Sequence, residues 1–399
     1  MTGLLQTGAF RWMWAGQTVS MLGDAVHDVA MAWLVLTLTG SPLTLGLVLV
    51  TGAVPRTVGM IFGGALTDRL SARTLLLLSN LVRCGLALLL ATLVLGRYLQ
   101  LWEIYVLELA FGAADGFFLP AVNAVVPDLV EDADLVRANA MMGTSEQVSM
   151  LAGPAVGGVI VALAGSGGAF LANALSFVVA AAGILPSGVQ KAPVPQSEPV
   201  WASIGQGITL VRADPELRAV FALAVAAATA GGAVFLVGLP TLAITRLGLG
   251  ATGLGLVLSS WGVGQLAGAL SAARTGLPRR WGYLIIASVL GDAVVYALVG
   301  SLHSVLGVMA LLVPLGCLTA YSSDVARPVW IQRHATPAML GRVFSLLELP
   351  YYAVAPLAMV AMGAIAARNL TLGFDAAASM MWVTAVLALA NRTVRGLTI

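Results

Sequence analysis

Long apolar stretches with few charged residues recur along the whole chain. A helix that crosses a lipid bilayer needs about 20 mainly apolar residues, and stretches of this kind account for most of the sequence. Charged residues make up 10% of the chain and apolar residues 59%, whereas a soluble protein carries about 25% charged residues. The chain is therefore predicted to be an all-α membrane protein, because most of its surface must face lipid.

The apolar stretches predict about twelve spans, which the longest polar segment divides into two sets of six. The chain then consists of an N-terminal half, 1–186, a linker, 187–216, and a C-terminal half, 217–399. The first six spans are expected near 12–38, 44–67, 74–96, 102–126, 139–164 and 167–186. The other six are expected near 217–244, 250–272, 281–300, 304–327, 344–366 and 371–391.

The linker carries an apolar pattern of its own. Trp201, Ile204, Ile208 and Val211 follow several prolines and share one helical face. This pattern favours a short amphipathic helix that lies on the inner leaflet; the alternative is a flexible connection.

The positions of lysine and arginine predict the orientation, because loops on the cytoplasmic side carry most of the positive charge. The chain has 20 such residues, and Arg56 and Arg83 fall inside spans. Only Arg97, Arg246 and Arg368 fall in the loops of one side. We therefore expect all the others, and both termini, on the cytoplasmic side.

A shift of 205 residues brings several positions of the two halves into register. The matching pairs are Gly59 with Gly264, Gly63 with Gly268, Arg69 with Arg274, Leu135 with Leu340, and Arg137 with Arg342. This pattern predicts two six-helix halves related by a pseudo-two-fold axis along the membrane normal, with the substrate site between them near the bilayer midplane.

The loop after the second span runs from Gly64 through Asp68 and Arg69 to Arg73. It resembles the signature loop of the major facilitator superfamily, glycine–x₃–Asp–Arg–x₃–Arg. The resemblance implies the major facilitator fold and implies that these four residues form a cytoplasmic gate. Ser71 replaces the glycine that is usual in this loop.

The fifth span contains Gly153, Pro154, Gly157 and Gly158. This run resembles the helix-5 motif of the antiporter branches of the superfamily. Proline removes a helical hydrogen bond and glycines permit close packing, so the alternative is a packing kink of a kind found in any membrane helix.

Three further stretches narrow the resemblance. They are Ser20–Asp24, Phe118–Ala140 and Leu340–Ser345. Together they are similar to the macrolide-efflux and enterobactin-exporter type of drug:proton antiporter, over roughly residues 10–390. The resemblance implies a multi-pass protein of the bacterial inner membrane.

Ionisable side chains inside the spans are costly and mark candidate functional sites. Asp24, His27 and Asp28 share one face of the first span, and Asp115 lies in the fourth. We expect these four residues to carry the coupling proton, with Asp24 ranked first. The alternative is that the acids form static pairs with the charge partners Arg56 and Arg83, as Asp24–Arg56 and Asp115–Arg83.

Large aromatic side chains are predicted to line the substrate cavity. The candidates are Trp33, Phe117, Trp261 and Tyr351. A cavity with apolar walls binds amphiphilic ligands with low specificity. The alternative for each of these aromatic residues is that it packs between helices or faces lipid. Trp12, Trp102 and Trp281 lie at span ends and are predicted to be interface anchors.

Several classes of function lack the residues that they need. Lys191 is the only lysine, and it does not stand in a phosphate-binding loop. His27, His303 and His334 are far apart, and no Cys/His cluster is present in the sequence. We therefore expect no enzyme activity, no cofactor, no metal site and no binding of nucleic acid.

These patterns predict a proton-coupled exporter of small amphiphilic compounds, of the multidrug type, that works by alternating access. Its expected partners are the substrate, protons and the lipid bilayer, and we expect a monomer. One alternative is a dedicated transporter of a single physiological solute, such as a siderophore or a lysophospholipid. The other is a membrane receptor that does not transport.

Overall fold

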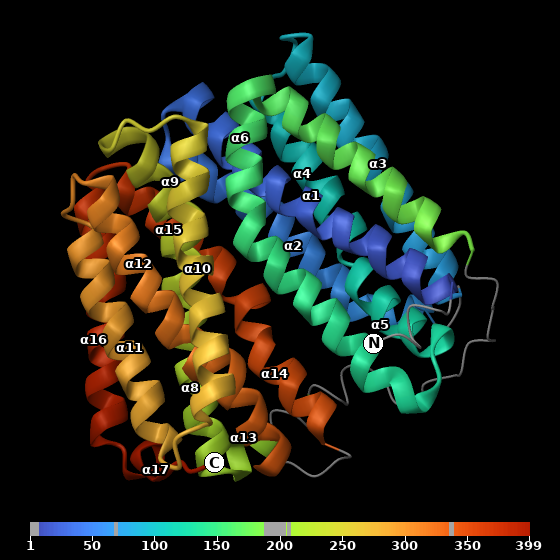
Figure 1. Cartoon of the computed structure of the whole chain (residues 1–399). Helices are drawn as coiled ribbons and strands as arrows, with labels where there is room; N and C mark the ends of the chain where they lie inside the picture. The colour runs from blue at the N-terminus through green and yellow to red at the C-terminus, as the bar shows by residue number, and fades with distance from the viewer. Residues whose placement is uncertain (1–7, 68–70, 187–204, 206–208, 335–338) are drawn as a thin grey trace. The chain divides into compact units, whose positions relative to one another are not determined.

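The computed structural model of the chain describes residues 8–67, 71–186, 205, 209–334 and 339–399, which fold almost entirely into helices (Figure 1). Up to residue 186 the helices are α1 (Gly8–Thr39), α2 (Pro42–Thr67), α3 (Ala72–Leu95), α4 (Leu101–Asp115), α5 (Phe118–Leu129) and α6 (Leu135–Ile184), with a 3₁₀ turn η2 (Asp132–Asp134). After the linker they are α8 (Pro215–Ala233), α9 (Leu239–Thr241), α10 (Ala251–Thr275), α11 (Trp281–Val299), α12 (Val305–Thr319), α13 (Arg327–His334), α14 (Leu340–Ala353), α15 (Ala355–Ala366), α16 (Leu370–Ala390) and α17 (Arg392–Gly396). Three π-helical segments join neighbouring helices: η3 (Val234–Gly238), η4 (Leu242–Arg246) and η5 (Ala320–Ala326).

Eleven helices in the described residues are long and apolar enough to cross a membrane. One of them, α6, has 50 residues and contains a backbone break at Gly165, where φ is 69°. Glycine tolerates this left-handed conformation because it has no Cβ, so the chain turns there and α6 supplies two crossings. The described residues thus hold the twelve expected crossings, and the predicted fold class is confirmed.

The fourth predicted span is interrupted in the structure. It separates into α4 and α5 at Gly116 and Phe117, directly after Asp115. Pro120 lies in the first turn of α5 and has no backbone N–H to continue the hydrogen-bond ladder of α4. The break therefore places a candidate site residue at a helix end.

The chain divides into two compact units. Unit 1 consists of residues 1–34, 51–197 and 250–256, and unit 2 of residues 35–50, 198–249 and 257–399. The predicted halves, 1–186 and 217–399, do not coincide with these units at the end of α1, at the start of α2 and at the start of α10. The division into six-helix halves stays a prediction.

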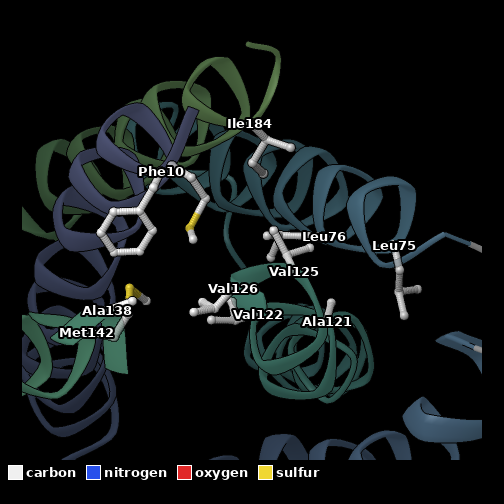
Figure 2. Packing of buried hydrophobic residues seen from close by; sticks show 11 residues of the cluster. Phe10, Leu75, Leu76, Ala121, Val122, Val125, Val126, Ala138, Met142 and Ile184 are labelled. Atoms are coloured by element: carbon white, nitrogen blue, oxygen red, sulfur yellow. The ribbon is translucent and has the colours of Figure 1, made fainter. Parts of the chain in front are cut away.

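One end of unit 1 is closed by a buried hydrophobic cluster. Its members come from α1, α3, α5 and both ends of α6, and they include Phe10, Leu76, Val126, Met142 and Ile184 (Figure 2). Elsewhere in the unit, α3 lies along α6 (Figure 1). These contacts hold α1 and α3 in fixed positions, and both helices carry candidate site residues.

In unit 2, α11 packs along α16, and α15 packs against α8. Trp281 was predicted to be an interface anchor, and this prediction is wrong, because its side chain is completely buried. Its Nε1 donates to the carbonyl oxygen of Ser322 at 3.1 Å, and its ring lies 5.2 Å from the ring of Trp330. Trp12 and Trp102 are exposed at 53% and 64%.

Two glycines that the 205-residue shift pairs lie at similar helix crossings. A Cβ built on Gly59 of α2 would lie 3.0 Å from the Cα of Gly116, which follows α4. A Cβ built on Gly264 of α10 would lie 3.0 Å from the amide nitrogen of Cys317 in α12. Each unit thus has a crossing at which the backbones touch.

The predicted amphipathic helix of the linker lies largely outside the described residues. Trp201, Ile204 and Ile208 belong to the undescribed part. Residues 209–213 are helical, and Val211 among them is buried.

Candidate functional site

Three candidate residues of α1 lie within four positions and differ in burial. The side chain of Asp24 is 33% exposed and that of His27 is 6% exposed, while Asp28 is exposed. Gly23 brings this part of α1 against α6, because a Cβ at that position would lie 2.6 Å from the amide oxygen of Asn173. The polar face of α1 is therefore held against neighbouring helices of unit 1.

Arg83 of α3 lies at the centre of a buried charge network. Its side chain is completely buried, and its Nη1 donates to Asp115 Oδ1 at 2.8 Å and to Asp24 Oδ2 at 3.4 Å. Its Nη2 donates to Asn80 Oδ1 at 3.1 Å. A buried guanidinium persists only when it is paired and hydrogen-bonded; these three acceptors satisfy its two terminal nitrogens, while its Nε has no partner among the described residues.

Aromatic rings cover the guanidinium of Arg83 as well. Its central carbon lies 4.5 Å from the ring centroid of Phe118 and 4.4 Å from that of Phe177. Rings at this distance attract a cation through their electron-rich faces. They also keep water from the Arg83 side chain, which strengthens its attraction to the two carboxylates.

Asp115 bridges the two arginines that lie inside spans. Its Oδ2 lies 2.6 Å from Nε of Arg56, whose side chain is 41% exposed. The sequence left open the pairs Asp115–Arg83 and Asp24–Arg56. The structure contains the first pair, but Asp24 shares Arg83 with Asp115, so one network replaces two separate pairs.

Backbone contacts between α2 and α4 bring these charges together. A Cβ on Gly112 would lie 2.9 Å from the Cα of Gly52, and one on Gly116 would lie 2.8 Å from the Cα of Gly59. Small residues let membrane helices approach until their backbones touch. The crossing thereby places Arg56 of α2 beside Asp115 at the end of α4.

A second pair, His27 and Glu108, lies apart from the arginine network. His27 Nε2 and Glu108 Oε1 are 3.0 Å apart, and the two side chains are 6% and 11% exposed. The imidazole stacks on Phe111, with ring centroids 4.8 Å apart, and lies 5.2 Å from the ring of Phe170.

Glu108 was not among the residues singled out from the sequence. A signal was present, because Glu108 lies in the apolar fourth span and precedes Asp115 by seven residues, which puts both on one face of a helix. The partner of Glu108 was not visible in the same way, because His27 belongs to another helix.

The residues of the signature loop are only partly described. Asp68 and Arg69 lie outside the described residues, and Gly64 belongs to the last turns of α2. Arg73 in the first turn of α3 donates to the carbonyl oxygen of Leu185 at 2.7 Å, which ties α3 to the end of α6. The role of these residues in a gate stays a prediction.

The helix-5 motif makes close contacts on two sides. A Cβ on Gly157 would lie 3.1 Å from the Cα of Val26 in α1. A Cβ on Gly158 would lie 3.1 Å from the Cα of Gly255 in the first turns of α10. Gly153 faces Ala25 of α1, and α6 remains helical through Pro154. The motif therefore serves as a packing surface within unit 1.

The four predicted cavity residues divide between the units. In unit 1, Trp33 is half-buried, and Phe117 packs against the cluster of Figure 2. In unit 2, the Trp261 ring lies 4.7 Å from that of Phe235, and Tyr351 is 40% exposed. Their part in substrate binding stays a prediction.

Unit 2 also has charged contacts among its described residues. Gln265 donates to Asp324 in the π-helical segment η5 at 3.1 Å, and Arg327 pairs with Glu348 at 3.0 Å. Within the ranges that the structure describes, no three His, Cys, Asp or Glu side chains are grouped so that they would hold a metal ion.

The sequence is similar to transporters of one superfamily. The family model for the transmembrane secretion effector matches residues 3–395. The uncharacterized transporter YfiS of Bacillus subtilis is 31% identical over 210 residues, which cover 51% of this chain and 49% of YfiS, so that match spans about half the length of the relative. The enterobactin exporter EntS of Escherichia coli is 27% identical over 347 residues, which cover 85% of this chain and 80% of EntS.

Solved structures of low sequence identity share the fold. A bacterial homologue of the human lysosomal transporter Spinster has a TM-score of 0.73 at 12% identity, with 96% of this chain and 94% of that chain covered. A POT family transporter in complex with 5-aminolevulinic acid has a TM-score of 0.75 at 13% identity, with 96% and 95% covered.

Proposed function

We propose a function from one premise: this chain belongs to the transmembrane secretion effector family of the major facilitator superfamily. It is a multi-pass membrane transporter and not an enzyme. The proposed function is export of small amphiphilic compounds in exchange for protons, by alternating access. The proposed location is the bacterial inner membrane, with both termini in the cytoplasm and the monomer as the working unit.

The charges inside the spans of unit 1 support proton coupling. Four carboxylates, Asp24, Asp28, Glu108 and Asp115, accompany two arginines, Arg56 and Arg83. When every carboxylate is ionised, two negative charges are left without an arginine. An uncompensated charge inside a membrane is expensive, so the cluster has a reason to take up protons, and this charge imbalance carries the proposal.

Asp24 is the first candidate for the coupling proton. It is the more distant of the two carboxylate acceptors of Arg83, at 3.4 Å against 2.8 Å for Asp115, and its side chain is one-third exposed. A proton on Asp24 removes its attraction to Arg83 and leaves the arginine with Asp115. Helix α1 can then move relative to α3 without separating the opposite charges of Asp24 and Arg83. Proton binding is thereby coupled to a conformational change.

Asp28 and Asp115 have different parts in this proposal. Asp28 is exposed and lies within electrostatic range of Arg56 and Asp115, so it serves as a second carrier. Asp115 lies between two arginines at 2.6 Å and 2.8 Å, so it serves to hold both arginines in position.

Gly64, Asp68, Arg69 and Arg73 are proposed as the cytoplasmic gate.

A transport experiment separates the proposal from its main alternative. Proteoliposomes with an imposed pH gradient would be incubated with ethidium, erythromycin or the iron-free siderophore enterobactin as external probes. Accumulation of ethidium and erythromycin, with mutual competition and loss of accumulation after nigericin, is the expected result. Flux that persists unchanged after nigericin collapses the pH gradient would contradict proton coupling.

The alternative is export of one siderophore-like solute. The similarity to EntS extends over 85% of the chain, which favours a solute of that kind more than the fold alone does. In the same experiment, this alternative predicts flux of enterobactin alone, with neither ethidium nor erythromycin as a competitor.

A further inference from the structure

The His27–Glu108 pair has the geometry of a proton-binding site. The Nε2 of His27 is 3.0 Å from Glu108 Oε1, whereas its Nδ1 is buried and has no hydrogen-bond partner among the described residues. An ionised carboxylate only accepts hydrogen bonds, so with Glu108 ionised the ring proton of His27 lies on Nε2. The Nδ1 lone pair is then free to bind a second proton.

Burial distinguishes this pair from the other charges of the cluster. Arg56 and Arg83 accompany Asp115 and Asp24, so Glu108 and Asp28 are the two carboxylates without an arginine. Asp28 is exposed, whereas the Glu108 side chain is 11% exposed and contacts His27, whose ring stacks on Phe111. A buried charge needs a partner of opposite sign, and Glu108 contacts no arginine among the described residues. Proton uptake at His27 supplies that partner.

We propose that His27 and Glu108 form a proton-binding pair that works beside the arginine network. A proton from water binds to Nδ1 of His27 and forms one N–H bond, while Nε2–H continues to donate to Glu108. The net charge of the pair changes from −1 to 0, and no other bond forms or breaks. Glu108 is thereby assigned to the proton-coupling site.

Other charged groups around the pair set its environment. The helices packed here bring Asp24 and Asp28 from α1, Arg56 from α2, Arg83 from α3 and Asp115 from α4. The two arginines contact Asp24 and Asp115. Glu108 is the only acid in direct contact with His27 in the described part of the chain, so it makes the largest contribution to proton binding there.

The pair gives the proposed transport cycle a proton-binding position besides the aspartates, and in this respect it rests on the proposed function. One proton binds at Asp24 and releases it from Arg83, and another binds at His27 and neutralises Glu108. Gly52 of α2 faces Glu108, since a Cβ there would lie 2.9 Å from Glu108 Oε2. A change in the charge of Glu108 is therefore felt directly at the crossing of α2 and α4.

Nitrogen NMR of the full-length protein in liposomes tests the pair without any transport substrate. The chain has only three histidines, so ¹⁵N-histidine labelling gives few signals, and His27→Asn identifies that of His27. We expect the signal of an Nε2–H tautomer at high pH and of an imidazolium at low pH. In Glu108→Gln, which keeps size and hydrogen bonding but removes the charge, the proton affinity of His27 should fall about 10- to 1,000-fold.

Two further variants make the outcome decisive. Glu103→Gln makes the same chemical change on the same helix, outside the pair, and should leave the His27 titration unchanged. Glu108→Asp keeps the charge and should keep most of the imidazolium; if Glu108→Gln does not fold, the titration of His27 in the wild type still tests the pair. A His27 that stays neutral down to pH 5, or that titrates identically in the wild type and the variants without the Glu108 charge, would overturn the proposal.

The result is independent of the transport assay. If His27 titrates as expected but the proteoliposomes show no proton-driven flux, the pair stands and the proposed function fails. If flux depends on the pH gradient but His27 does not titrate, coupling rests on the aspartates alone.

Discussion

Arg83 donates to Asp115 at 2.8 Å from a side chain that is completely buried. This contact joins α3 to the end of α4, and Asp24 adds α1 to the same arginine. A single guanidinium thus connects three helices of unit 1. Its removal affects both the stability of the unit and the charge balance on which the proposed function depends.

Replacing Arg83 by alanine should destabilise the protein strongly. The substitution leaves two carboxylates without their buried partner, and removal of one member of a buried pair typically costs about 3–5 kcal/mol. A thermal unfolding scan in detergent should show a large fall in melting temperature. The control is Arg137→Ala. The Arg137 side chain is 70% exposed, so its ion pair with Asp134 should contribute less than about 1 kcal/mol to stability. Equal effects of the two variants would contradict the central place given to Arg83.

Replacing Gly112 by alanine should force α2 and α4 apart. The added Cβ would meet backbone atoms of Gly52 rather than the end of a flexible side chain, so the helices cannot adjust locally. We expect a lower melting temperature together with loss of transport, because Arg56 would move away from Asp115. Gly85→Ala is the matched control, since a Cβ there has nothing within 4 Å. Gly85→Ala should be neutral or stabilise the protein by up to about 1 kcal/mol. If Gly112→Ala behaves in the same way, α2 and α4 are not in tight contact at Gly112.

Asp214 should stabilise the start of α8 except in strong acid. It caps α8 by accepting from the backbone N–H groups of Glu216 and Leu217, and His334 of α13 contacts its other oxygen at 2.7 Å. Burial acts to raise the pKa of Asp214, but hydrogen bonds from His334 and these N–H groups outweigh burial and hold the pKa below its usual value of 3.8. A lowered pKa means that stability is present above the unfolded value and is lost as the pH falls through the folded value.

The expected result is a lower melting temperature for Asp214→Ala at neutral pH, by the equivalent of about 0.5–2 kcal/mol. The difference from the wild type should shrink below about pH 4, where the carboxyl becomes protonated. Asp214→Asn serves as the control, because asparagine also caps helices. A difference from the wild type that is as large at pH 3 as at pH 7 would argue against this account of Asp214.

The positions of the spans could be predicted from the sequence because each is a local property. A run of apolar residues has to cross lipid as a helix whatever its neighbours are, and the break at Gly165 falls between two predicted spans. The charge partners depend instead on how the helices are rotated against one another. Glycine contacts such as Gly52 with Gly112 set that rotation, and the apolar pattern of a single helix does not reveal them.

The misses have the same origin. Glu108 was passed over because its partner, His27, is 81 residues away in the chain. Asp24 was matched with Arg56 because both lie near the middle of their spans, whereas in the structure it contacts Arg83. Trp281 was placed at the membrane interface from its position at a span end, but Trp330 of another helix covers it.

Substrate-dependent proton movement tests the central claim most directly. The protein would be reconstituted with a pH-sensitive dye inside the liposomes, and a probe that the wild type transports would be added to Asp24→Asn, Asp28→Asn and Asp115→Asn. We predict that at least one of these variants loses proton movement while it still binds the probe. Full proton coupling in all three variants would contradict the claim that Asp24, Asp28 or Asp115 carries the coupling proton.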